Sequence, residues 1–585
     1  MPTLNWIGKE AVETHHKEIP FRLIEPVPEL SCGDHESGNL VVQGDNLLAL
    51  KALLPRFAGQ VKCIYIDPPY NTGNEGWVYN DNVNSPEILK WLGETVGKEG
   101  ETLDRHDRWL CMMYPRLLLL KQFLREDGAI FVSIDDNELG NLQALMREVF
   151  GAGNEVATVV WEKGKKGDSK LVSVTHEYIV AFARNKSLLK AQKITWRRKK
   201  PGVEEVLEYY NSLRKNNGED HVQIRKEMMA WYRAMPKTDP RKGHKHYNWS
   251  DSKGLYFAAD FAGPDDGREN RPRYPIPHPI TKQDCAMPST GWRWEEDTTK
   301  AALADVPPRI HFGKDHTTIP NRKSYLFEVD EEPMMSVIYK DGRGATLEVE
   351  SILGAGAFPF PKDSEVIADL IGMVTEPGDI VLDSFGGSGT TAHAVLKRNQ
   401  HLTTPLRFIL IEIEKDTAEN KTRERIKKAV EGFTPLAGKK KTPVPGLGGG
   451  FQYCQLSEQT LFQTDGLIRP EVRFDQLAEF VWFMETGVGI SRSSLVGRVH
   501  PSPFLGLYKG RAVFLLHGNI LDDQQGADGN VLNSRTLAYL AELLPDFDGP
   551  RVIYGARTRL DKAKLARLNI TFHQLPYELA IKTWF

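Results

Sequence analysis

The sequence predicts an α/β protein with a mostly parallel sheet covered by helices on both faces, an insert within that core, and a separate C-terminal domain. Two observations lead to this fold class. Short apolar runs rich in β-branched residues alternate with segments of helical periodicity along residues 39–184, and the alternation returns at 354–438. Between these stretches the alternation is lost, so the core is predicted to be discontinuous in sequence.

The domain boundaries follow from these changes of pattern. A polar, proline-containing segment precedes the first strand, and a basic Pro/Gly-rich connection follows the second half of the core. The predicted divisions are an N-terminal arm at 1–38, the first half of the core at 39–184, an insert at 185–353, the second half of the core at 354–438, a linker at 439–450 and a C-terminal accessory domain at 451–585.

Strands and helices of the first half are predicted from runs and periodicity. Residues 61–66 and 128–134 are mostly apolar and show no regular polar alternation, which is typical of buried parallel strands. Asp135 and Asp136 are expected to cap the helix that follows the second run. The other predicted elements of this half are a strand at 40–42, helices at 47–54, 107–125 and 139–150, and two edge strands at 156–161 and 177–183.

The same reasoning gives fewer elements after residue 184. In the insert, only 203–234 has a helical pattern. The second half of the core is predicted to contain a helix at 364–373, a strand ending at Asp383, a glycine turn leading into a helix, and a strand at 408–412. The C-terminal region is expected to hold a helix at 474–484 and strands at 512–516 and 552–554.

Composition excludes several classes of protein. Of the 585 residues, 40% are hydrophobic and 26% charged, which is ordinary for a soluble globular chain. The five cysteines form no Cys-x-x-Cys pair, so no zinc site or disulfide framework is indicated and no metal is expected. The longest apolar run, near 117–120, is too short to cross a bilayer, and the first residues lack a signal-peptide pattern. A cytoplasmic location is therefore expected.

The net charge of −3 hides a basic block. Residues 161–250 contain 21 Lys and Arg against 10 Asp and Glu. Such a block inside a neutral protein indicates binding to a polyanion, although a solvated helical surface would have the same composition. Basic residues alternate with aromatic ones here, which suits phosphate contacts together with base stacking. The candidates for DNA binding are Arg197, Arg198, Lys199, Lys200 and Arg293.

The first chemical motif follows the strand at 61–66 and reads Asp67-Pro68-Pro69-Tyr70. Prolines donate no backbone hydrogen bond and fix φ, so the Pro68 carbonyl is free to face a cleft beside the Asp67 carboxylate. Two acceptors and the flat ring of Tyr70 suit the exocyclic amino group of a planar base. The alternative is a proline turn in which Asp67 only caps a helix.

The second motif runs from Asp383 through Gly386, Gly387 and Gly389 to Thr391, at the end of a predicted strand. The glycines allow close backbone approach, and the helix that follows offers unpaired N–H groups. It lacks the Gly-Lys-Ser/Thr ending of a phosphate-binding loop. Glu412 ends the next strand, in the position from which a carboxylate binds ribose hydroxyls in Rossmann-like sheets, or else it caps a helix.

The motif Asp67-Pro68-Pro69-Tyr70 resembles the catalytic motif of DNA amino-methyltransferases, which methylate N6 of adenine or N4 of cytosine. The longer run from Tyr65 to Asn74 resembles the modification subunit of Type III restriction–modification systems, and the resemblance extends from about residue 44 to 450. The glycine segment is similar to that family's S-adenosylmethionine site, with Gly387 in place of the usual alanine. The order of the motifs resembles the beta class, a circular permutation of the common Rossmann-like methyltransferase sheet.

This resemblance implies a site-specific DNA methyltransferase acting on N6 of a flipped-out adenine in double-stranded DNA, with the insert as a target-recognition domain. The catalytic residues would be Asp67, Pro68, Pro69 and Tyr70. The segment 358–362 resembles the one that packs on the methionine part of the cofactor, with Asp363 where a proline is common. The implied S-adenosylmethionine contacts are Asp45, Asp67, Lys362, Asp383, Phe385, Gly386, Gly387, Ser388, Gly389, Thr390, Thr391 and Glu412, although Asp45 could simply cap the helix after it.

Other functions remain open at the level of sequence. N4 of cytosine is an alternative target, but that branch more often has serine in the place of Asp67. The chain could instead be a DNA-recognition subunit of a defence complex in which methylation is secondary. RNA or protein methylation is disfavoured, because it usually goes with asparagine at position 67. The expected partners are double-stranded DNA, a restriction (helicase–nuclease) or other defence subunit, and a second copy of the chain, with no membrane.

Overall fold

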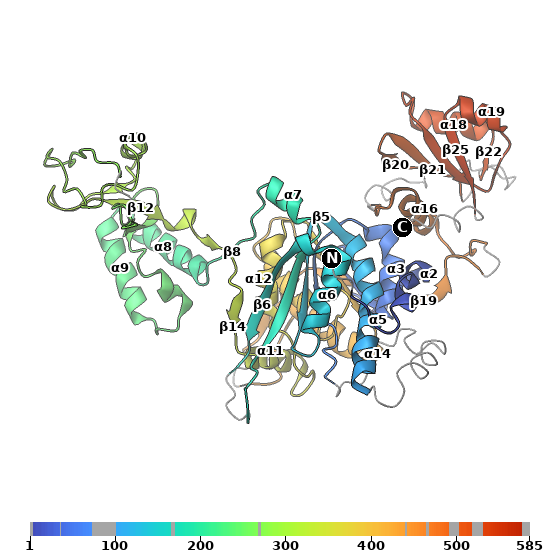
Figure 1. Cartoon of the computed structure of the whole chain (residues 1–585), viewed down its shortest axis with the longest axis horizontal. Coiled ribbons are helices and arrows are strands. Elements are labelled where there is room, and N and C mark those ends of the chain that lie inside the picture. The colour runs from blue at the N-terminus through green and yellow to red at the C-terminus, as the bar shows by residue number, and fades with distance from the viewer. Residues whose placement is uncertain are drawn as a thin grey trace. The chain divides into compact units, whose positions relative to one another are not determined.

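The computed structural model divides the chain into two compact units (Figure 1). One comprises Met1–Thr195 with Met335–Phe585, and the other is Trp196–Met334. The residues that the structure describes are 4–34, 37–72, 101–164, 170–266, 271–438, 442–463, 467–490, 502–517 and 530–575. Within them, no helix is both long and apolar enough to cross a membrane.

An 11-stranded sheet forms the centre of the larger unit. Its middle strands are parallel and lie in the order β3-β16-β15-β4-β5, followed by the antiparallel β7 and β6 at one side. This confirms the predicted α/β fold class and the two further strands, although these do not form the sheet edge, because another strand pairs with β6 on its outer side. The bounds are β3 Leu40–Gln43, β16 Arg407–Glu412, β15 Ile380–Asp383, β4 Val61–Ile66, β5 Leu124–Ile134, β7 His176–Ala183 and β6 Glu155–Glu162.

Alternate residues of these strands pack on opposite faces of the sheet. Ile64 and Ile66 of β4 belong to one large apolar core together with α3 (Asn46–Phe57), α5 (Glu101–Phe123) and α6 (Leu139–Phe150). Cys63 and Tyr65 are buried as well but point to the other face, where α12 (Ser364–Val374) and α13 (Thr390–Asn399) lie. The sheet is therefore covered on both sides, as continuous apolar strands require.

The smaller unit lies inside the predicted insert of 185–353 but is narrower than it. The flanking helices α7 (Lys186–Ala191) and α11 (Arg343–Leu353) belong to the larger unit, and β14 (Val337–Tyr339) pairs in parallel with β6. Sequence patterns could not place this boundary, because edge elements have weak periodicity. The predicted helix at 203–234 is two helices, α8 (Val203–Asn217) and α9 (His221–Ala234). The unit also holds α10 (Glu296–Ala304) and a sheet in the order β11-β12-β10-β9 (Ile310–His311, Asn321–Tyr325, Leu255–Ala259 and Trp249–Ser250).

Both predicted ends of the core need correction. β1 (Arg22–Pro26) lies within the predicted N-terminal arm and pairs with β19 (Gly450–Thr460), which starts at the predicted boundary of the C-terminal domain. β19 in turn lies parallel to β3, so it extends the core sheet. The rest of the C-terminal region contains the predicted helix, α16 (Phe474–Thr486), and a four-stranded sheet β20-β21-β23-β25 (Phe504–Tyr508, Arg511–Leu515, Arg551–Gly555 and Ile570–Gln574) with α18 (Ser534–Leu543) and α19 (Lys562–Arg567).

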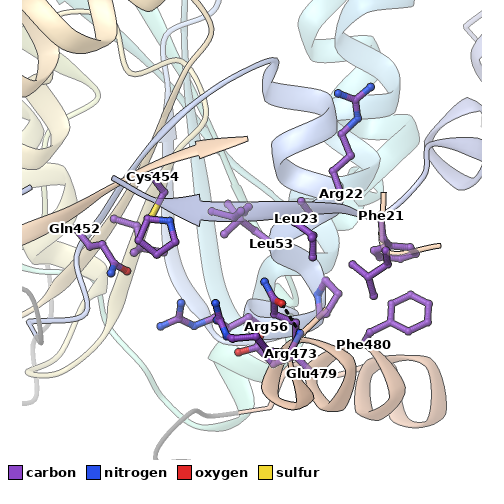
Figure 2. A pocket seen from close by; sticks show the side chains of 17 residues that line it. Phe21, Arg22, Leu23, Leu53, Arg56, Gln452, Cys454, Arg473, Glu479 and Phe480 are labelled. Carbon is purple, nitrogen blue, oxygen red and sulfur yellow. Dashed lines mark hydrogen bonds between the residues drawn. The ribbon is translucent and has the colours of Figure 1, made fainter. Parts of the chain in front are cut away.

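A small cavity of about 80 Å³ lies among β1, α3, β19 and α16 (Figure 2). Leu23, Leu53 and Phe480 contribute apolar surface to it, and Arg56 and Arg473 also line it. None of the residues that the sequence predicts for catalysis or cofactor binding lines this cavity. It therefore marks where α16 of the C-terminal region packs on the core.

Replacing Phe451 by alanine tests whether β19 belongs to the core. This side chain is fully buried, and its loss removes apolar contacts and leaves a void. We expect the free energy of unfolding in urea to fall by about 3–5 kcal/mol. The exposed Gln455 of the same strand is the matched control, and its alanine variant should stay within about 0.5 kcal/mol of the parent. Equal effects of the two changes would contradict a core position for β19.

Candidate active site at the carboxyl ends of the strands

The topology brings both sequence motifs to one edge of the sheet. β15 lies between β4 and β16, and all three strands run in parallel. Asp67 directly follows β4, Asp383 ends β15 and Glu412 ends β16. Ligands of open α/β sheets bind at this edge, outside the carboxyl ends of the strands. Two motifs that are far apart in the chain thus share one site.

The Asp67 carboxylate has one oxygen occupied and one without a partner. Its Oδ2 lies 2.9 Å from the Nζ of Lys362. Its Oδ1 is buried and accepts no hydrogen bond from any described residue. A buried acceptor without a donor is costly, so this atom is suited to receive an N–H group from a ligand.

The turn after Asp67 is held from three sides. Trp109 Nε1 donates a hydrogen bond to the Pro69 carbonyl at 2.7 Å, and the Tyr70 hydroxyl donates to Glu177 Oε2 at 3.3 Å. Asn71 adopts a left-handed φ of 57°, and its side-chain amide donates to the buried carboxylate of Glu138. These contacts fix the orientation of the Tyr70 ring. Glu177 and Glu138 lie outside both motifs, and nothing in their local sequence marks them.

Lys362 connects the Asp67 turn with its surroundings. Its Nζ lies 3.6 Å from Glu177 Oε2 and 4.8 Å from the centroid of the Tyr70 ring. Burial alone would lower the pKa of Lys362, but the carboxylates of Asp67 and Glu177 raise it, so the amine is charged. Lys163 Nζ lies 2.5 Å from the other oxygen of Glu177. Positive and negative groups therefore alternate across the site.

The glycine loop is braced by its own Asp383. Oδ1 of Asp383 accepts from the backbone N–H of Phe385 at 2.9 Å, and Oδ2 accepts from the Thr391 hydroxyl at 2.6 Å. Burial raises the pKa of Asp383 to about 8. Gly387 and Gly389 have φ of 48° and 76°, which residues with a side chain rarely adopt. The loop thus depends on glycine at these two positions.

Glu412 holds this loop from the neighbouring strand. Its Oε2 accepts from the Gly387 N–H at 2.7 Å, and its Oε1 accepts from the Glu414 N–H at 3.0 Å. Burial raises its pKa. Glu412 is not the N-cap of the helix after it, because Glu414 occupies that position. The helix-cap interpretation is therefore wrong for Glu412.

A buried arginine donates hydrogen bonds to the glycine loop. Arg425 of α15 (Arg423–Glu431) is fully buried and donates to the hydroxyls of Ser388 and Thr390 at 3.0 and 2.8 Å. It also donates to Glu348 Oε2 of α11 at 2.9 Å, and Lys397 donates to the other oxygen of Glu348 at 2.6 Å. No sequence motif marks Arg425, Glu348 or Lys397, which lie on three different helices, so only the fold reveals this cluster.

The glycine loop also contacts two neighbouring segments. The Thr390 hydroxyl lies within 3.5 Å of the Lys362 carbonyl. Asn46 Nδ2 donates to the Ser384 carbonyl at 3.0 Å, and the buried Arg116 donates to Asn46 Oδ1 at 2.5 Å. The glycine loop therefore contacts both the segment that reaches Asp67 and the start of α3.

Of the acids expected to cap helices, Asp45 does so, whereas Asp135 and Asp136 do not. Asp45 caps α3, since its Oδ1 accepts from the Leu48 N–H at 3.0 Å. Asp135 and Asp136 do not cap α6: the N-cap is Glu138, Asp135 accepts from the Asn137 N–H, and Asp136 accepts from the Tyr178 hydroxyl. The two extra residues before the helix place these carboxylates too far from its first N–H groups.

The basic residues chosen for DNA binding differ in their surroundings. Arg198 lies in an ion pair with Glu332 at 3.0 Å, and Lys199 in one with Asp330 at 2.6 Å. Arg197 and Arg293 are exposed, whereas Lys200 is half-buried. Burial lowers the pKa of Arg322, and the nearby charge of Arg293 lowers it further. The guanidinium groups of Arg293 and Arg322 therefore lie close together. Arg293 is thus an exposed candidate with a second guanidinium group close by.

The sequence is similar to those of known proteins. Residues 61–423 match the family model of N6/N4 DNA methylases, described as DNA methylase. The chain is 32% identical to the Type III restriction–modification enzyme EcoP15I Mod subunit of Escherichia coli, over 71% of this chain and 65% of that protein. It is also 32% identical to the EcoPI Mod subunit of Escherichia phage P1, over 72% and 64%. The matches span less than two thirds of each relative's length.

A parallel sheet with an acid–proline–proline–tyrosine turn and a glycine loop at neighbouring strand ends is the arrangement of a DNA amino-methyltransferase core. This chain belongs to the N6/N4 DNA methylase family. A solved cytosine-N4-specific PvuII DNA methyltransferase aligns with 12% identity and a TM-score of 0.31, over 69% of this chain and 89% of that one. That similarity is too low for comparing individual residues.

Replacing Glu348 by glutamine tests the support beneath the glycine loop. Burial opposes ionisation of Glu348, but the charges of His393, Arg425 and Lys397 lower its pKa from 4.5 to about 2. A lowered pKa in the folded state stabilises the protein above pH 4.5, and this contribution is lost as pH falls towards 2. We expect the variant to lose about 3 kcal/mol of unfolding free energy at pH 7 and much less at pH 3. A pH-independent difference in urea unfolding would contradict this role.

Proposed function

We propose that this chain transfers a methyl group from S-adenosylmethionine to N6 of a flipped-out adenine in double-stranded DNA. The observation that supports this most is the buried Oδ1 of Asp67, an acceptor with no donor among the described residues, beside the glycine loop. An exocyclic amino group supplies the missing N–H. The curated relatives are named as modification subunits of Type III systems, and we propose the same role here.

The residues around the loop fit the cofactor. Ser384 Oγ is buried and has no hydrogen-bond partner among the described residues, so it joins Asp67 Oδ1 as a polar atom that awaits a ligand. Bound there, S-adenosylmethionine supplies an electrophilic methyl group on a sulfonium. The loop from Asp383 through Phe385 and Gly386 to Thr391 would hold its amino-acid part. Glu412 would bind the ribose of the cofactor, and Asp45 would lie near its adenine. Both carboxylates now accept hydrogen bonds from backbone N–H groups, which they would give up or share when the cofactor binds.

The chain's own groups orient the nucleophile. The lone pair of an aromatic amino group is delocalised into the ring, so the nitrogen reacts poorly while it is planar. Asp67 Oδ1 and the Pro68 carbonyl each accept one N–H, which favours the pyramidal nitrogen and aims its lone pair at the methyl group. Rate enhancement then comes from positioning and from preorganised acceptors. Asp67 has no need to remove a proton before attack.

The target base must leave the duplex to reach this turn, at a cost of a few kcal/mol. Tyr70 offers a ring face for stacking, and its hydroxyl is anchored on Glu177. The smaller unit, Trp196–Met334, would recognise the target sequence. We further propose that the chain works with a restriction (helicase–nuclease) subunit or another defence subunit, and as a homodimer.

Methylated DNA from cells that express the chain tests this proposal. Sequencing that detects N6-methyladenine should find it at one recurring sequence, which also identifies the recognition site. Methylation at N4 of cytosine would instead establish the second candidate target, since the family model covers both atoms. Unmodified DNA in the presence of folded protein would contradict the proposed activity.

The role of Asp67 is tested by its replacement with alanine. We expect methyl transfer to fall by on the order of a thousandfold or more, because the oriented acceptor is lost. Binding of S-adenosylmethionine, measured by calorimetry, should change little. The matched control is Asp136→Ala, which removes an exposed acid at the end of the neighbouring strand β5. Normal turnover by the Asp67 variant would remove this residue from the mechanism.

Charge reversal at Arg293 tests the proposed DNA surface. The exposed guanidinium would contact a phosphate, so Arg293→Glu should weaken binding and reduce the slope of log K against log salt by about 0.9 per lost contact. Fluorescence anisotropy at several salt concentrations gives both values. Arg147→Glu, on the core helix α6, is the control. An unchanged slope for Arg293→Glu would place the DNA elsewhere.

A further inference from the structure

A lysine lies over the Tyr70 ring, where the proposed function stacks the target base. The Lys362 ammonium lies 2.9 Å from the Asp67 carboxylate and 4.8 Å from the centroid of the Tyr70 ring. These are the two groups that an adenine amino nitrogen and its ring would contact. Lys362 is only 7% exposed, so its ammonium lies inside the site.

The incoming base must compete with this ammonium group. The amino group would take Oδ1 of Asp67 while the ammonium holds Oδ2, but the base and the ammonium both face the Tyr70 ring, and the ammonium carries a full charge. Displacing it without another partner would leave a buried charge uncompensated, which is far more costly than losing a neutral hydrogen bond. A site that admits a base therefore needs a second position for Lys362.

Glu177 supplies that position. It lies on β7, is 6% exposed, and its Oε2 is 3.6 Å from the same Lys362 Nζ. The side chain of lysine is flexible and its ammonium is a point charge, so a small shift brings it to hydrogen-bond distance of Glu177. Lys163 balances the charge of Glu177 on its far oxygen, at 2.5 Å.

We propose that Lys362 fills the target-base position in the resting enzyme and moves from Asp67 to Glu177 when the flipped base enters. Glu177 is then a positioning residue that neither motif contains. This inference rests on the proposed function and extends it. It also changes the role of Lys362, which the sequence analysis assigned to the cofactor.

The test measures base flipping, separately from methyl transfer. A duplex carries 2-aminopurine at the adenine mapped by sequencing, and its fluorescence rises when the base leaves the stack. Glu177→Gln removes the charge but keeps an oxygen for the Tyr70 hydroxyl. We expect its flipped fraction to fall on the order of tenfold. Lys362→Met needs no relocation and should flip at least as well as wild type.

The double variant separates this role from a general structural one. If Glu177 acts by accepting Lys362, then Glu177→Gln combined with Lys362→Met should flip like Lys362→Met alone. The control is Glu155→Gln. Glu155 lies on the neighbouring strand β6 and forms an ion pair with Arg147 of α6, so this variant loses an acid from another ion pair and should flip the base normally. Thermal unfolding of each variant verifies the fold.

Three results would overturn the proposal: normal flipping by folded Glu177→Gln, equal loss in Glu177→Gln and the double variant, or reduced flipping by Lys362→Met. The last measurement stands even if Glu177→Gln does not fold. Failure here is distinct from failure of the proposed function, because methylation by the wild-type chain is established beforehand by sequencing.

Discussion

The parallel pairing of β15 with β4 on one side and β16 on the other is the constraint from which the site follows. Leu382 pairs with Ile64 of β4 and with Ile409 of β16, so the three strands end at nearly the same level. Each end carries an acid or a glycine turn. Chain order is irrelevant to this arrangement, and the core tolerates an insert between its halves because the sheet reunites them.

Charge balance is the second feature that shapes the site. Lys163, Glu177, Lys362 and Asp67 alternate in sign along a line of contacts of 2.5, 3.6 and 2.9 Å. Each charge has an opposite neighbour, which offsets part of the cost of burying it. Tyr70 is hydrogen-bonded to Glu177 in the middle of this line, so the Tyr70 ring and the Asp67 carboxylate are positioned by one set of interactions.

Local sequence was enough for the parts of the fold with strong periodicity. The strands at 61–66 and 408–412, and the helix at 139–150, were predicted close to their observed bounds, because a buried run or an amphipathic stripe needs no information from elsewhere. The turn at Asp67 and the loop at Asp383 were also found, since each combines a strand end with residues that restrict or free the backbone.

What the sequence did not reveal depends on long-range contacts. Glu177, Glu138 and Arg425 are single polar residues in ordinary strands and helices, and only the fold gives them partners. The pairing of β1 with β19 joins two segments that are far apart in the sequence, so neither strand has a local signal that assigns it to the core. The ion pairs of Arg198 and Lys199 likewise arise from a strand more than a hundred residues away.

A crystal structure of the chain with S-adenosylhomocysteine would test most directly whether the two motifs form one site. We expect the ligand to contact the Gly386–Gly387 turn and Glu412, with its sulfur facing Asp67 and Pro68. A ligand bound away from the carboxyl ends of β4 and β15, or with its sulfur turned from Asp67, would contradict it.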